Sequence, residues 1–189
     1  MTIEYAILGL LSWRALSGYD LKKIFEESVA LYWTGNNNEV YRALLELHAQ
    51  GLVSFQVQPQ EKLPARKVYA ITPQGRAELA GWAASPPELP QRRHALLIQL
   101  AWADALAPAE LEQLLARYED EVQTQALICL AQLQPAPQSA RARFLDPSAA
   151  RTPREAILWR AILQNWTDFY DSELEWVRNL RQALASETP

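Results

Sequence analysis

Four stretches of sequence follow one another and decide the fold of this chain: SGYDLKKIFEES (residues 17–28), NNNEVYRALLELHAQG (36–51), VSFQVQ (53–58) and ARKVYAIT (65–72). In the first, Ser17 and Asp20 have the spacing of a capping box, in which each side chain accepts a hydrogen bond from the other residue's backbone amide. We therefore predict a helix that begins at Gly18 and ends near Ser28.

The second stretch predicts another helix, over residues 36–50. Asparagine is a favoured residue at helix starts, and Gly51 suits the position just past a helix end. Val40, Leu44 and Leu47 recur at helical spacing, so we expect them to form a buried face.

The last two stretches predict a hairpin. Apolar and polar residues alternate over residues 53–58, as in a half-buried strand, and residues 67–72 supply the return strand. The tip between them, residues 59–66, contains two prolines and the cations Lys62 and Arg66, with Lys67 next to it. A core helix that begins after Thr2 should precede these elements, and a helix that begins with Thr72 as N-cap should follow them. This order is the outline of a winged helix-turn-helix with a wing over residues 53–71.

The outer face of the helix over residues 36–50 carries side chains suited to DNA. Asparagine and arginine can pair with the edges of adenine and guanine, and tyrosine can reach a phosphate. Cations in the wing would neutralise phosphates. The predicted DNA-binding residues are Tyr19, Lys22, Lys23, Asn37, Asn38, Tyr41, Arg42, Lys62, Arg66 and Lys67. The alternative is that the asparagines only cap the helix and that the hairpin charges are only solvated.

These residues resemble the PadR family of transcriptional regulators. The resemblance is carried by YAILGLL (5–11), SGYDL (17–21), VYRAL (40–44), GLV (51–53), RKVYAIT (66–72) and GR (75–76). It implies a winged DNA-binding domain, and the C-terminal half is similar in kind to the longer subgroup, whose helical domain supports dimerisation. The family consists mainly of repressors, and similar members respond to phenolic or other aromatic compounds. One departure is Glu39, where the family often has an uncharged polar residue; its carboxylate would repel phosphate or accept from a cytosine amino group.

The charge is distributed unevenly along the 189 residues. The whole chain has a formal net charge of −4, yet residues 1–84 carry eight basic and eight acidic side chains, so all the excess acid lies in residues 85–189. DNA contact by a neutral domain must depend on the local placement of cations and not on a basic field over the whole domain.

Several functional classes find no support in the sequence. HExxH, P-loop and nucleophile-elbow motifs are missing, so we expect neither an enzyme nor a cofactor. His48 and His94 lie far apart and fit helix-surface or interface roles better than metal ligation. The single cysteine, Cys129, should be a buried packing residue. No signal peptide or membrane-length apolar run is present, which favours a cytoplasmic protein.

The prolines divide the chain into two predicted domains. Residues 85–90 form a proline-rich linker between a domain over 1–84 and a helical domain over 91–186. In the latter we predict helices over 91–105, 108–133 and from 153 to about 184, with a polar connection over 134–152. The first of these should present Ala95, Ile98 and Trp102 on one side.

The helical domain carries an aromatic and aliphatic stripe. We predict that it supports a homodimer or an effector pocket through Trp102, Trp159, Ile162, Trp166, Phe169, Val177 and Leu180. A dimer would read a dyad with half-sites about 10 base pairs apart, or a multiple of that spacing. One alternative is that the stripe is the core of a monomeric bundle. Another is that the chain is a protein-interaction module whose winged domain no longer binds DNA.

Overall fold

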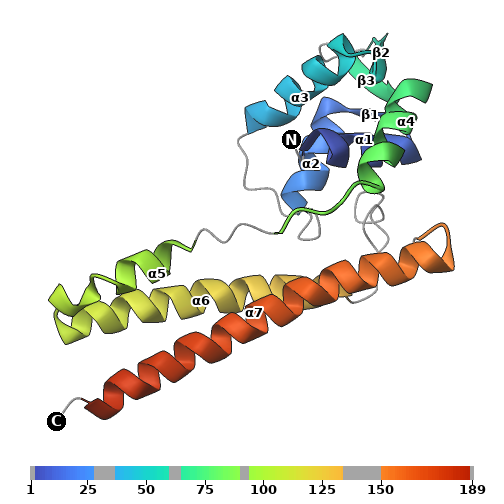
Figure 1. Cartoon of the computed structure of the whole chain (residues 1–189). Helices are drawn as coiled ribbons and strands as arrows, with labels where there is room; N and C mark the ends of the chain where they lie inside the picture. The colour runs from blue at the N-terminus through green and yellow to red at the C-terminus, as the bar shows by residue number, and fades with distance from the viewer. Residues whose placement is uncertain (1–2, 28–36, 60–64, 90–93, 134–149, 188–189) are drawn as a thin grey trace. The chain divides into compact units, whose positions relative to one another are not determined.

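The computed structural model describes residues 3–27, 37–59, 65–89, 94–133 and 150–187 (Figure 1). These residues form two compact units, one within residues 1–87 and one within residues 88–189. The fold is mainly helical with one small antiparallel sheet in the first unit. The predicted class, a winged helix-turn-helix followed by a helical region, is confirmed.

The first unit contains four helices and three strands among its described residues. They are α1 (Ile3–Trp13), β1 (Leu16–Ser17), α2 (Gly18–Glu27), α3 (Asn37–Ala49), β2 (Val53–Gln58), β3 (Arg66–Ile71) and α4 (Pro73–Ala83). The sheet order is β1-β3-β2, and both neighbouring pairs are antiparallel. The sequence predicted only the β2–β3 hairpin. It gave no sign of β1, because a strand of two residues is too short to show alternation.

Local sequence signals set the element boundaries as predicted. The backbone amide of Ser17 donates to Asp20 Oδ2 at 3.1 Å and the amide of Asp20 donates to Ser17 Oγ at 3.2 Å, which is the expected capping box of α2. At the start of α4, Gly75 donates its amide to Thr72 Oγ1 at 3.0 Å. The predicted end of α2 at Ser28, and the predicted helix-start positions Thr2 and Asn36, lie outside the described residues.

Helix α3 ends at a glycine for a clear backbone reason. Gly51 has φ of +72°, in the left-handed region that favours glycine. Its amide donates to the carbonyl of His48 at 3.0 Å, and the amide of Leu52 donates to that of Leu47 at 2.9 Å. These two bonds form a Schellman motif, which satisfies carbonyls at the helix end and turns the chain directly into β2.

The core of the first unit is built from the predicted apolar faces. Val40, Leu44 and Leu47 of α3 are buried against α1 residues such as Leu8 and Leu11. The alternation predicted for β2 weakens toward the tip, since Val57 is exposed. The buried side of α3 is thereby fixed, and its opposite side must face outward.

The second unit contains α5 (Ala95–Leu100), the short 3₁₀ helix η1 (Ala103–Ala105), α6 (Pro108–Leu133) and α7 (Pro153–Glu187). The two long helices lie side by side (Figure 1). Leu96, Leu115 and Val177 form one buried cluster of the unit. No helix in the described parts of the chain has both the length and the apolar content needed to cross a membrane.

The prediction of one helix over residues 91–105 is wrong. Helix α5 ends at Leu100, and Trp102 has non-helical backbone angles (φ −120°, ψ 7°) before η1 begins. Ala95, Ile98 and Trp102, which the prediction placed on one side of that helix, are all exposed, and the buried residue of α5 is Leu96. The segment is apolar on nearly all sides, so its pattern could not identify the face that packs.

Candidate nucleic-acid interface

The outward face of α3 has two parallel ridges of side chains. Asn38, Arg42 and Glu46 follow one another at four-residue steps, and Tyr41 and Leu45 form the neighbouring row. Arg42 has 72% of its side chain exposed, and Leu45 is 61% exposed. One ridge is therefore polar and charged, and the other is aromatic and apolar.

The polar ridge holds its arginine loosely. Arg42 Nε lies 3.6 Å from Glu46 Oε1 one helical turn away, and both side chains are well exposed. An exposed pair of this kind contributes only about 0.3–0.5 kcal/mol. A stronger acceptor, such as a guanine edge or a phosphate, can therefore take over the guanidinium at small cost.

The start of α3 places the remaining polar candidates. Asn38 is exposed, and Glu39 is half-buried in the first helical turn, where a carboxylate interacts favourably with the helix dipole. The backbone of Asn37 is helical, but its side chain lies outside the described residues. Glu39 therefore has a structural role open to it besides any contact with DNA.

The aromatic ridge depends on a close approach between two helices. A Cβ atom at Gly18, the first residue of α2, would lie 2.6 Å from Cε1 of Tyr41. Only glycine allows this separation. The Tyr41 ring is therefore placed against the start of α2, while 46% of the residue stays exposed.

The wing brings two cations to the same region. Arg66 Nη1 lies 3.9 Å from Asp20 Oδ2, the carboxylate that caps α2, and Lys67 Nζ lies 4.5 Å from the centre of the Phe55 ring. These contacts hold both cations near the sheet without burying them. Lys62, the third predicted wing cation, lies outside the described residues.

A groove of about 700 Å³ joins these elements. Its lining includes Tyr19, Tyr41, Leu45, Arg66, Lys67 and Tyr69. Burial raises the pKa of the Tyr69 hydroxyl, and nearby Tyr41 adds to the effect, so Tyr69 remains neutral at physiological pH. The groove therefore offers phenol groups, the Leu45 side chain, two cations and the Asp20 carboxylate on a single surface.

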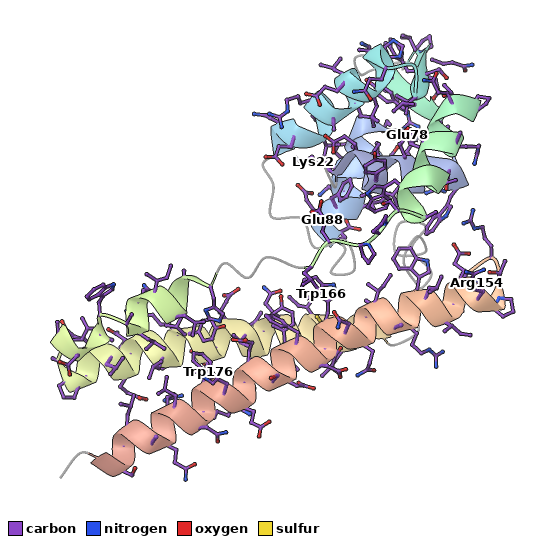
Figure 2. All side chains as sticks on the ribbon, viewed as in Figure 1. Lys22, Glu78, Glu88, Arg154, Trp166 and Trp176 are labelled. Carbon is purple, nitrogen blue, oxygen red and sulfur yellow. The ribbon has the colours of Figure 1, made fainter. Side chains whose placement is uncertain are left out.

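Two other predicted cations are paired within their own helix. Lys22 Nζ and Lys23 Nζ lie 3.5 Å and 3.4 Å from carboxylate oxygens of Glu26. Lys22 is labelled on α2 in Figure 2. Four of the ten predicted residues line the groove, namely Tyr19, Tyr41, Arg66 and Lys67. Arg42 lies on the adjoining polar ridge.

The predicted residues of the second unit occupy different environments. Val177 is fully buried within its own unit, and Leu180 packs beside it. Trp166 makes ring contacts with Phe169 and Tyr170, Trp159 is half-buried, and Ile162 and Trp102 are exposed. The stripe is therefore part intrachain core and part outer surface.

A polar cluster in the second unit was missed by sequence reasoning. His94 Nε2 lies 2.9 Å from Glu173 Oε2, and the Tyr118 hydroxyl donates to the same oxygen at 2.8 Å. Trp176, labelled in Figure 2, lies beside both rings, with its ring centre 5.9 Å from that of His94. The cluster ties the start of α5 to α6 and α7. Its members are too far apart in sequence for any spacing to have revealed it.

Metal chemistry has no candidate site in the part of the chain that the structure describes: no group of three His, Cys, Asp or Glu side chains is placed to bind an ion there. Cys129 is fully buried, as predicted. Burial raises the pKa of its thiol, and Asp171 adds to the shift, so the thiol stays protonated and unreactive.

Comparison with known proteins identifies both units. Residues 7–81 match the transcriptional regulator PadR-like family, and residues 92–185 match the family described as virulence activator alpha C-term. The first unit carries a PadR-like family domain. This family is one of transcriptional regulators and not of enzymes, in agreement with the sequence-based expectation.

Two curated relatives match about half of the chain at moderate identity. The chain is 40% identical over 98 residues to the probable transcriptional regulator Rv1176c of Mycobacterium tuberculosis, which is 51% of this chain and 52% of that protein. It is 33% identical over 89 residues to the negative transcriptional regulator PadR of Bacillus subtilis, covering 47% and 49%. The chain thus spans about half the length of the curated relatives it matches.

Solved PadR structures share the whole fold. Bacillus subtilis PadR in complex with operator DNA matches with a TM-score of 0.78 at 19% identity, over 97% of this chain and 99% of that one. The same protein in complex with p-coumaric acid matches with a TM-score of 0.72 at 20% identity, over 98% and 99%. At these identities the likeness establishes the PadR fold alone.

Proposed function

We propose that this chain is a DNA-binding transcriptional repressor that reads its operator through α3 and the wing. The observation that carries the proposal is the groove that places Tyr41 and Leu45 of α3 beside Arg66 and Lys67 of the wing. A recognition helix and a cationic hairpin on one surface match the two parts of a winged DNA reader.

The residues divide into two roles under this proposal. Arg42 and Asn38 contact base edges in the major groove, with Asn37 beside them at the helix start. Arg66, Lys67 and the hydroxyls of Tyr19 and Tyr41 contact phosphates, which hold the helix in register. Lys22 and Lys23 add a weaker attraction because Glu26 already pairs with both.

We further propose that the chain acts as a homodimer in the cytoplasm, where it meets chromosomal DNA. The long helices expose several large apolar side chains: Leu127, Ile128, Leu130, Ile157, Leu158 and Ile162. Apolar surface of this kind commonly marks an interface between proteins. A second copy would cover it and double the DNA contacts on a dyad operator.

A small aromatic effector is proposed as the release signal. The support is the p-coumaric acid complex of Bacillus subtilis PadR and the aromatic residues of α7, including Trp159, Trp166 and Phe169. An effector acts only if it binds the DNA-competent and DNA-incompetent states with different affinity.

The test is selection of bound duplexes from a random DNA pool, followed by sequencing and by sedimentation of the protein alone. The proposal expects an enriched two-fold repeat and a dimer. Arg42→Ala should weaken binding to the selected duplex about tenfold or more. Arg117→Ala, which removes the same charge at an exposed residue of α6, should leave that binding unchanged. A pool without enrichment would favour the protein-interaction alternative, and an unchanged affinity of Arg42→Ala would remove α3 as the reader.

For the effector, p-coumaric acid is the probe. Release of the selected duplex at concentrations that leave the protein folded supports this part of the proposal, and unchanged affinity removes p-coumaric acid as the signal.

A further inference from the structure

Leu45 is in an unusual position for an aliphatic side chain. It is 61% exposed, more than any other large apolar side chain in the described parts of the first unit. It does not belong to the core, whose α3 members are Val40, Ala43, Leu44 and Leu47. Packing within the chain therefore does not explain a leucine at this position.

The neighbours of Leu45 indicate what could cover it. It lies one turn after Tyr41 on the aromatic ridge and next to Arg42 on the polar ridge. It also lines the groove that contains Arg66 and Lys67. A partner that fits this face should attract three cations, of which Arg42 and Arg66 already lie near Glu46 and Asp20, and should also offer an apolar group to Leu45. The major groove of DNA does both, because phosphates flank it and thymine presents a C5-methyl group within it.

We propose that Leu45 is a specificity-determining residue that packs against the C5-methyl group of a thymine beside the base read by Arg42. The inference rests on the proposed DNA-reading function. Leucine has no hydrogen-bonding group, so it distinguishes bases only by covering a methyl group or by failing to satisfy a polar edge. Cytosine carries only a hydrogen at C5, so it offers no methyl group to Leu45, and leucine cannot accept a hydrogen bond from the neighbouring amino group.

The expected size of the effect follows from the area of one methyl group. Deleting a methyl group that is buried in the complex should lower the binding affinity about fourfold. The contribution is smaller than that of an arginine paired with guanine, so Leu45 adjusts the preferred sequence and does not supply most of the binding.

The experiment uses the full chain and a duplex selected from a random pool. Each thymine in the duplex is replaced in turn by deoxyuridine, which lacks only the methyl group, and binding is measured for the wild type and Leu45→Ala. The wild type should lose about fourfold at one position in each half-site. Leu45→Ala should bind thymine and uracil equally at that position.

The matched control is Leu97→Ala, which truncates an exposed leucine on α5 that does not line the groove. This variant should keep the wild-type sensitivity to uracil. Unfolding temperatures of the variants should equal that of the wild type, since both side chains are exposed. Two results would overturn the inference: a wild type that is insensitive to uracil at every position, or a Leu45→Ala variant that keeps the sensitive position. If selection enriches no duplex, the proposed function itself is wrong, which is a distinguishable failure.

Discussion

Gly18 and Tyr41 are coupled by contact, since a side chain on the first residue of α2 would overlap the tyrosine ring of α3. This contact places the phenol of Tyr41 in the groove between α3 and the wing. The residue at the start of α2 therefore determines where the Tyr41 ring of α3 can lie.

The first prediction concerns Gly18→Ala. The new methyl group should push the Tyr41 ring aside, since the ring is the movable partner, and weaken DNA binding several-fold. Because the ring can swing toward solvent, the cost in unfolding free energy should stay at the low end of overpacking, about 1 kcal/mol. Gly81→Ala is the control, because no atom lies within 4 Å of the added group. It should stabilise the protein by about 0.4–1 kcal/mol and leave DNA affinity unchanged. If Gly18→Ala bound DNA as tightly as the wild type, the position of the Tyr41 ring against α2 would not matter for DNA binding.

The second prediction concerns Gly75→Ala at the start of α4. The added Cβ would lie 2.2 Å from the carbonyl oxygen of Leu52, and that oxygen also accepts hydrogen bonds from the amide and hydroxyl of Thr72. Neither backbone can move without breaking these bonds. We expect a loss of at least about 1–3 kcal/mol in chemical denaturation. If Gly75→Ala were as stable as the wild type, the close approach between α4 and the carbonyl of Leu52 would not constrain this residue.

The third prediction is a pH dependence from the ion pairs between α6 and α7. Hydrogen bonds from Arg178, at 2.7 Å, and from Arg181 lower the pKa of Glu119 below its ordinary value of 4.5. A lowered carboxyl pKa gives stability that is fully present above pH 4.5 and is lost as the pH falls through the lowered pKa. As the pH is lowered below 4.5, the unfolding temperature of the wild type should therefore fall more steeply than that of Glu119→Gln. If the unfolding temperatures of the two proteins fell in parallel with pH, the ion pairs of Glu119 would not be the source of this pH dependence.

The fourth prediction concerns the single cysteine. Cys129 is fully buried and its thiol pKa is raised. A thiol-specific reagent should react with the native protein only through unfolding, and at once in denaturant. Rapid labelling of the native protein at neutral pH would show that α6 opens at Cys129.

Much of the first unit was predictable because its signals are local. The capping box of Ser17 and Asp20, the left-handed Gly51 and the apolar spacing of α3 each concern residues within one or two turns. Two-residue β1 was missed because its pairing with Val68 and Tyr69 is purely tertiary. Likewise, Gly18 could be predicted as a helix start, but not as the neighbour of Tyr41.

The second unit was less predictable because its α5 region is apolar on nearly every side. Without a polar face, the pattern could not show that Leu96 turns inward or that the helix stops before Trp102. The His94–Glu173 contact joins residues 79 positions apart, so no spacing rule applies to it. The candidate DNA residues were identified by residue type and by helix face. The groove that joins them is formed by tertiary contacts between separate elements, which no local pattern reveals.

DNA reading by the full chain can be measured by fluorescence anisotropy on its selected duplex and on a scrambled duplex, over a salt series. A DNA-reading regulator should prefer the selected duplex at every salt concentration. The logarithm of its binding constant should fall linearly with the logarithm of salt concentration, by about 0.9 per phosphate contacted. Equal affinity for both duplexes, or binding that does not change with salt, would contradict the account.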